Sequence, residues 1–129
     1  MNILFLCVGN SARSQIAEGL AKEMLGSKYV IKSAGSKPSG NVHPNAVLAM
    51  NEIGIDISDQ FSKSIDDLDE DFINNLDFVI TLCSEEVCPV LNNDAKKIHW
   101  MNEDPINKNF SDVQLRIAFS KVRDNLYNL

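Results

Sequence analysis

Residues 3–14 read ILFLCVGNSARS, and this stretch decides how the chain folds. The apolar run at residues 3–6 predicts a short, buried strand of a parallel sheet. Over residues 14–25, apolar side chains recur at helical spacing and predict a helix. Cys7 and the small, polar residues after it therefore form a loop between the end of a strand and the start of a helix.

This loop has the features of an oxyanion site. A helix N-terminus presents unpaired N–H groups and the positive end of the helix dipole, and together they attract anions. The amides of residues 8–13 can wrap the oxygens of a tetrahedral anion, and the guanidinium of Arg13 can bind two of those oxygens at once. The predicted oxyanion-binding residues are Val8, Gly9, Asn10, Ser11, Ala12, Arg13 and Ser14.

The same positive field acts on Cys7. A cysteine that faces a helix N-terminus and an arginine is favoured as the thiolate, which makes it a nucleophile aimed at the bound anion. A single cysteine at the end of a strand is more often a small, buried apolar residue. The Cys-x5-Arg-Ser spacing favours the catalytic interpretation, because spacing, loop chemistry and structural context agree.

Composition sets limits on the class of protein. The chain has 129 residues, 44% hydrophobic and 23% charged, and these values predict one soluble domain over residues 1–129. With the Cys7 loop, we expect this single domain to be catalytic. Without a long apolar stretch or a signal-peptide pattern, we expect a cytoplasmic protein. The formal net charge of -6 argues against nucleic acid as a partner. We therefore expect neither nucleic acid nor membrane as a partner. We also expect a monomer.

Strands and helices alternate along the rest of the chain. Further strands are predicted at 28–35, 78–82 and 97–100, further helices at 44–53, 66–76 and 111–126, and a functional loop at 55–64. This alternation predicts an α/β fold, a small four-stranded parallel sheet with helices on both faces. Ligands of such sheets bind beyond the carboxyl ends of the strands. Cys7, Cys83 and the loop carrying Asp104 should therefore meet at one edge.

Asp104 stands directly before Pro105 in a turn-forming loop. At the active edge, its carboxylic acid could protonate an oxygen that leaves from a centre attacked by Cys7. On local grounds alone it is a turn residue of the kind favoured before proline.

Two more cysteines, Cys83 and Cys88, are separated by four residues. A zinc site would need two more ligands, and His43 and His99 are not at a ligand spacing, so no metal site is predicted. A redox pair fits better, since Cys83 could attack Cys7 and Cys88 could then attack Cys83. The alternative is two buried apolar cysteines.

The motifs resemble those of thioredoxin-coupled arsenate reductases, which share the fold of the low-molecular-weight protein tyrosine phosphatases. The resemblance covers essentially the whole chain. It rests on Cys7–Ser14, Ser33–Gly35, Thr81–Cys83, Cys88–Pro89, His99–Trp100 and Glu103–Pro105.

The resemblance implies a three-thiol mechanism with no bound cofactor and with electrons from reduced thioredoxin. Cys7 would attack arsenate while Asp104 protonates the departing hydroxide. Cys83 would then attack Cys7 and release arsenite, and Cys88 would resolve the resulting disulfide. The side chains of Asn10, Ser11 and Ser14 match the family's loop and would brace it and tune the thiolate.

The sequence departs from the family pattern in three places. Ala12 replaces a cysteine that usually precedes the arginine, and the spacing from Cys83 to Cys88 is short. Related enzymes also bind potassium beside the loop. Three of the cation ligands are matched by Asn10, Glu18 and Ser33, but Lys63 stands in place of an aspartate. We hypothesise that the Lys63 ammonium replaces the cation; the alternative is a solvated loop lysine.

Two other functions remain open. A phosphatase would use Cys7, Arg13 and Asp104 in the same way and hydrolyse the intermediate with water. Phosphatases of this fold tend to place an aromatic residue after the Asp-Pro pair, and the aliphatic Ile106 favours a small inorganic substrate instead, although residual phosphatase activity is expected. A noncatalytic oxyanion-binding or redox-sensing protein would use its thiols without turnover.

Overall fold

The computed structural model describes residues 1–83, 95–100, 105 and 111–127. Cys88, Glu103, Asp104 and Ile106 lie outside these ranges. The elements are β1 (Asn2–Cys7), α1 (Arg13–Leu25), the 3-10 helix η1 (Gly26–Lys28), β2 (Val30–Gly35), α2 (Pro44–Asn51), the 3-10 helix η2 (Ile65–Asp67), α3 (Glu70–Asn74), β3 (Leu76–Thr81), β4 (Lys96–His99) and α4 (Asp112–Tyr127). None of the helices in the described ranges is long and apolar enough to cross a membrane.

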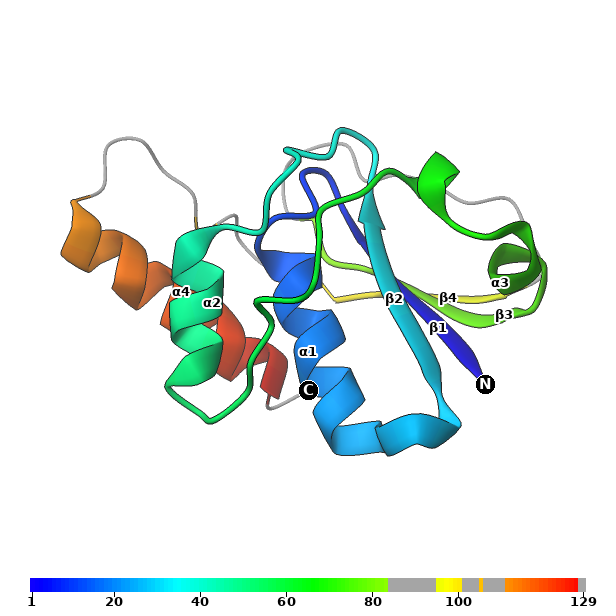
Figure 1. The fold of residues 1–129 in the computed structure, drawn as a ribbon, viewed down its shortest axis with the longest axis horizontal. Coiled ribbons are helices and arrows are strands. Elements are labelled where there is room, and N and C mark those ends of the chain that lie inside the picture. Colours follow the sequence, from blue (N-terminus) through cyan, green and yellow to red (C-terminus); the bar gives the residue numbers. More distant parts are fainter. Residues whose placement is uncertain (84–94, 101–104, 106–110, 128–129) are drawn as a thin grey trace.

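The four strands form one parallel sheet in the order β2-β1-β3-β4, as predicted (Figure 1). β1 lies at the centre, where Cys7 is paired with Gly35 of β2 and Leu6 with Thr81 of β3. The chain leaves β1 through α1 to reach β2 and later returns to the other side of β1 as β3. The strand order therefore reverses beside β1, which is where ligands of such sheets bind.

Helices cover both faces of the sheet, which confirms the predicted fold class (Figure 1). Ile3 and Phe5 pack into a core with residues of α1, α2 and α4. The alternate residues Leu4 and Leu6 pack on the other face, with Phe72 of α3. A strand that is buried on both faces reads as a continuous apolar run, and this explains residues 3–6.

The helix predicted over residues 66–76 is wrong. The structure has two short helices there, η2 and α3, and β3 already begins at Leu76. The Ser64 side chain accepts a hydrogen bond from the amide of Asp66 and starts η2, and Asp69 caps α3 in the same way. An N-cap residue has extended backbone, so a second cap at Asp69 interrupts the helix that the composition favours.

Candidate active site

Cys7 is the last residue of β1, and Cys83 follows the end of the neighbouring strand β3. The amide of Leu82 donates to the carbonyl of Leu6 at 2.9 Å, so the two chains still run side by side at this edge. The structure therefore places Cys7 and Cys83 at the same end of adjacent strands. Asp104 and Cys88 lie outside the described residues.

The carbonyl groups of residues 8–12, in the loop between β1 and α1, accept hydrogen bonds from residues outside the loop. The donors are Lys37 N to Val8 O, Ser39 N to Gly9 O, Gln15 Nε2 to Asn10 O, His43 N to Ser11 O and Ile16 N to Ala12 O, at 2.8–3.0 Å. In a trans peptide the C=O and the next N–H point in opposite directions. The amides of residues 9–13 are therefore directed away from these partners, toward the inside of the loop, where they can bind an anion.

Gly35 allows the loop to lie against the end of β2. A Cβ atom at this position would be 2.3 Å from the carbonyl oxygen of Val8 and 3.1 Å from the Cβ of Asn10. The first distance is far inside van der Waals contact, and the obstacle is backbone. The Ser33–Gly35 motif therefore ends in glycine because a side chain would displace the loop.

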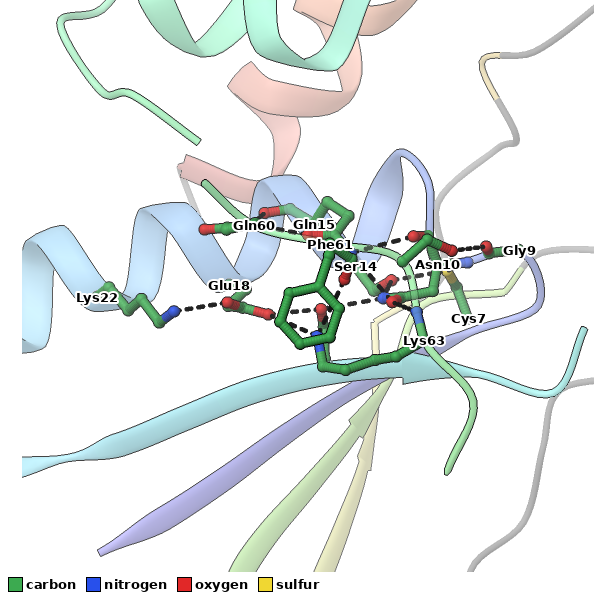
Figure 2. Close-up of polar contacts among 12 residues, drawn as sticks. Cys7, Gly9, Asn10, Ser14, Gln15, Glu18, Lys22, Gln60, Phe61 and Lys63 are labelled. Atoms are coloured by element: carbon green, nitrogen blue, oxygen red, sulfur yellow. Dashed lines mark hydrogen bonds and ion pairs between the residues drawn. The ribbon is translucent and has the colours of Figure 1, made fainter. Parts of the chain in front are cut away.

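Cys7 is a free thiol that is 2% exposed at the base of the loop. Its Sγ is 2.8 Å from the Oγ of Ser14 and 3.3 Å from the amide of Asn10 (Figure 2). Asn10 is fully buried and has a positive φ of 48°, a conformation that asparagine tolerates better than most residues. This backbone turn directs the Asn10 amide at the sulfur.

Arg13 is the first residue of α1 and is 4% exposed. Its Nη1 is 3.5 Å from the carbonyl oxygen of Leu82, so the guanidinium reaches from the loop to the end of β3. In the described part of the chain, α1 has no side-chain cap and no acidic residue in its first turn. Its N-terminal amides and Arg13 thus give a local positive site in a chain of net charge -6.

The structure brings together the four residues considered for a cation site. Asn10 Nδ2 donates to Ser33 Oγ at 2.9 Å, and Ser33 Oγ donates to Glu18 Oε1 at 2.6 Å. The Nζ of Lys63 donates to the carbonyl of Phe61 at 3.1 Å and lies 3.8 Å from Glu18 Oε1 (Figure 2). A positive charge therefore stands beside the buried Glu18 carboxylate.

Lys63 is 8% exposed, so the solvated loop lysine is the wrong alternative. Burial lowers the pKa of Lys63 below its ordinary value, and the nearby Glu18 carboxylate partly opposes this shift. Glu18 also accepts a hydrogen bond from Lys22 at 2.6 Å. The carboxylate is thus neutralised from two sides.

The predicted loop at 55–64 contacts the site through residues that the sequence analysis did not single out. Gln60 donates to Gln15, and Gln15 donates to Asn10 and to the carbonyl of Phe61. Gln15 is fully buried in the first turn of α1. The one signal for its burial in the sequence is its place next to the apolar residues of α1. That signal is weak, because a glutamine at such a place is often on the surface.

The histidines and Cys83 have other partners. His43 caps α2 by accepting from the amide of Asn45 at 3.1 Å, and His99 Nδ1 lies 2.6 Å from Thr81 Oγ1. Cys83 is 1% exposed and disulfide-bonded, with its partner outside the described residues. Within those ranges no cluster of His, Cys, Asp or Glu could hold a metal ion.

The sequence as a whole matches a known family. The family model for the low molecular weight phosphotyrosine protein phosphatases matches residues 2–126. The chain belongs to this family. An arsenate reductase of Bacillus subtilis (strain 168) is 44% identical to this phosphatase-family chain over 128 residues, which are 98% of this chain and 89% of the relative.

Solved structures of the phosphatase family agree with the fold. An arsenate reductase in the phosphate binding state has a TM-score of 0.78 and 35% identity, with 98% of this chain and 91% of the other covered. A thioredoxin-dependent arsenate reductase of Corynebacterium glutamicum has a TM-score of 0.70 and 31% identity. That match covers 98% of this chain and 58% of the other.

Proposed function

We propose that this chain is an arsenate reductase that uses three cysteines in sequence. The observation that carries the proposal is that two cysteines, Cys7 and Cys83, lie at the same edge of the sheet. Cys7 lies free at the base of an amide-lined loop, and Cys83 follows the adjacent strand in a disulfide. The curated relatives that are 44% identical over nearly the whole chain are named arsenate reductases, which supports the same activity.

In the first step the Cys7 thiolate attacks the arsenic atom of arsenate, which is held by the loop amides and by Arg13. A sulfur–arsenic bond forms, and an oxygen leaves as water after Asp104 donates a proton. In this step the protein supplies a preorganised set of donors that stabilises the charge on the oxygens as the bond forms.

In the second step the Cys83 thiolate attacks Cys7 Sγ. A new sulfur–sulfur bond forms as the sulfur–arsenic bond breaks. The two electrons of the broken sulfur–arsenic bond stay on arsenic, which leaves as arsenite. Cys88 then attacks Cys83 and releases the Cys7 thiolate. A dithiol of the thioredoxin class reduces the Cys83–Cys88 disulfide and is itself oxidised, so that the electrons balance.

The disulfide at Cys83 supports a redox role for this residue. Its position after β3, the strand next to the one that ends in Cys7, supports direct exchange with Cys7. The thioredoxin-dependent arsenate reductase of Corynebacterium glutamicum supports thioredoxin as the reductant. The roles of Cys88 and Asp104 rest on the sequence resemblance, since both lie outside the described residues.

The second candidate function is phosphate ester hydrolysis, which the membership in a phosphatase family favours. The same loop would hold a phosphoryl group, and water would hydrolyse the phosphocysteine at Cys7. The amides of the loop would bind the oxygens of a tetrahedral group, and arsenate and phosphate present the same oxygens, so residual phosphatase activity is part of the proposal.

We further propose that Lys63 replaces a bound potassium ion beside the loop. Its ammonium is buried, faces the Glu18 carboxylate and donates to the carbonyl of Phe61, as a cation at this place would be coordinated. A covalently attached charge needs no ion from solution, so activity should be insensitive to potassium.

One comparison of variants tests these functions. We would measure arsenate-dependent NADPH oxidation with thioredoxin and its reductase, and separately the hydrolysis of p-nitrophenyl phosphate, for Cys7→Ser, Cys83→Ser and Cys88→Ser. An arsenate reductase loses the first activity in all three variants and the second in Cys7→Ser alone. A phosphatase shows no arsenate turnover in any protein, and a sensor shows neither activity. Glutaredoxin with glutathione, used in place of thioredoxin, identifies the reductant.

A further inference from the structure

Gln15 is a fully buried polar side chain that no step of the reaction uses. Its Nε2 donates to the backbone carbonyl of Asn10 at 3.0 Å, to Asn10 Oδ1 at 3.0 Å and to the carbonyl of Phe61 at 2.9 Å (Figure 2). Its Oε1 accepts from Gln60 Nε2 at 2.8 Å.

These contacts allow one orientation of the Gln15 amide. Three carbonyl oxygens face one end of it, and an oxygen placed there would meet acceptors alone. Gln60 is held in turn, because its Nε2 also donates to the backbone carbonyl of Gln15 at 3.0 Å. The hydrogen bonds of the two glutamines therefore run in a single direction, from Gln60 to Gln15 to Asn10.

Gln15 and the backbone amide of Lys63 together fix the orientation of the Asn10 side chain. Asn10 Oδ1 accepts from Gln15 and from the amide of Lys63 at 2.9 Å, so its Nδ2 must face the other way. There Nδ2 donates to Ser14 Oγ at 2.8 Å. A serine oxygen that accepts this bond keeps its own proton for the remaining neighbour, Cys7 Sγ at 2.8 Å.

We propose that Gln15 is a positioning residue for the nucleophile, held in orientation by Gln60 and acting on Cys7 through Asn10 and Ser14. Among the described residues, the Gln15 side chain bonds to Asn10, Phe61 and Gln60 and not to the sulfur. Its role is to direct the Ser14 hydroxyl proton at Cys7 and to keep the Asn10 amide in place, which favours the thiolate. The inference deepens the proposed function, because it concerns the state of the same nucleophile.

The test measures the thiolate of Cys7 directly, without turnover. In a Cys83→Ser/Cys88→Ser background, Cys7 is the one cysteine of the chain, and thiolate ultraviolet absorbance against pH reports its ionisation. Gln15→Met keeps the length of the side chain and removes its hydrogen bonds. At the pH where half of the parent Cys7 is thiolate, we expect the thiolate-to-thiol ratio to fall about tenfold, the effect of losing one charge-assisted hydrogen bond.

Val79→Ala is the matched control, since Val79 is equally buried but packs on the opposite face of the sheet. It should lower the melting temperature and leave the ionisation of Cys7 unchanged. A Gln15→Met protein that is destabilised like the control, with the parental pH profile, would overturn the proposal.

Gln60→Met decides the question if Gln15→Met does not fold. Gln60 is half-buried, so this variant should fold. We expect a fall in the thiolate-to-thiol ratio of about threefold, because Gln15 keeps its own carbonyl partners. An unchanged profile in that case rejects the relay. Absence of arsenate turnover in the parent would reject the proposed function alone, since the ionisation of Cys7 is measured independently.

Discussion

Cys7 and Cys83 stand at the ends of adjacent parallel strands, and both are almost completely buried. Their surroundings differ. Cys7 is a free thiol at a helix N-terminus, with the Ser14 hydroxyl and the Asn10 amide on its sulfur. Cys83 follows a strand that leads into no described helix and is disulfide-bonded. Equal burial therefore leaves the two thiols in different surroundings: hydrogen-bond donors and a helix N-terminus lie at Cys7, and a disulfide at Cys83.

The largest effect is expected from a change at Arg13, whose guanidinium reaches from the loop after Cys7 to the carbonyl of Leu82, next to Cys83. Arg13→Lys keeps the charge but loses the planar fork that binds two oxygens at once. We expect kcat/KM for arsenate and for a phosphate ester to fall about a hundredfold to a thousandfold. Steady-state kinetics measures both values. The midpoint potential of the Cys83 disulfide should stay unchanged. A clear shift of that potential in Arg13→Lys would contradict the prediction that Arg13 acts on the anion at Cys7.

The second largest effect is expected from Gly35→Ala, which moves the loop around Cys7 and leaves the end of β3 intact. The new Cβ meets the Val8 carbonyl, so we expect a loss of about 1–3 kcal/mol in the free energy of unfolding and about tenfold weaker phosphate binding. Urea unfolding and phosphate protection against thermal unfolding measure these quantities.

Gly26→Ala is the control for this change. Gly26 has a φ of 75° and open space around it, at the far end of α1, so an alanine should cost about 1 kcal/mol by backbone strain. Phosphate binding should remain parental. If both variants weakened phosphate binding in proportion to their loss of stability, the weaker binding of Gly35→Ala would come from destabilisation and not from displacement of the loop.

A smaller effect is expected at Lys63, whose ammonium lies 3.8 Å from Glu18 Oε1. The parent should show the same activity in potassium chloride and sodium chloride at equal ionic strength. Lys63→Asp places a second carboxylate near Glu18, so we expect activity to fall a few-fold in sodium and to recover in potassium. Rate measurements in the two salts decide this. Clear potassium stimulation of the parent would contradict the replacement of the cation by Lys63.

The smallest effect concerns pH. Burial lowers the folded-state pKa of Lys63 below its ordinary value of 10.5, so the unfolded chain binds more protons between the two values. Stability must rise with pH in this window, because deprotonation removes the cost of a buried charge. Urea unfolding of the parent and of Lys63→Met at several alkaline pH values should show the parent gaining stability relative to the variant. A parent that loses stability relative to Lys63→Met as the pH rises would contradict this prediction.

Local patterns were sufficient for much of the fold and for the centre of the site. The apolar run before Cys7 and the helical spacing after it located the loop, and the spacing of Arg13 indicated an oxyanion site. The pattern failed over residues 66–76, where Asp69 suited a helix start and a helix interruption equally well. A capping residue does not reveal from sequence whether it begins the first helix or the second.

Local patterns in the sequence located the loop between β1 and α1, because strand and helix periodicity and the Cys-to-Arg spacing depend on neighbouring residues. The tertiary structure alone decided what holds that loop: the donors of residues 37–43 on its carbonyls, the close approach at Gly35, the burial of Lys63 and the Gln60–Gln15 contact to Asn10. Most of these contacts join residues that are far apart in sequence. They arise from the packing of one segment on another, which no local pattern encodes.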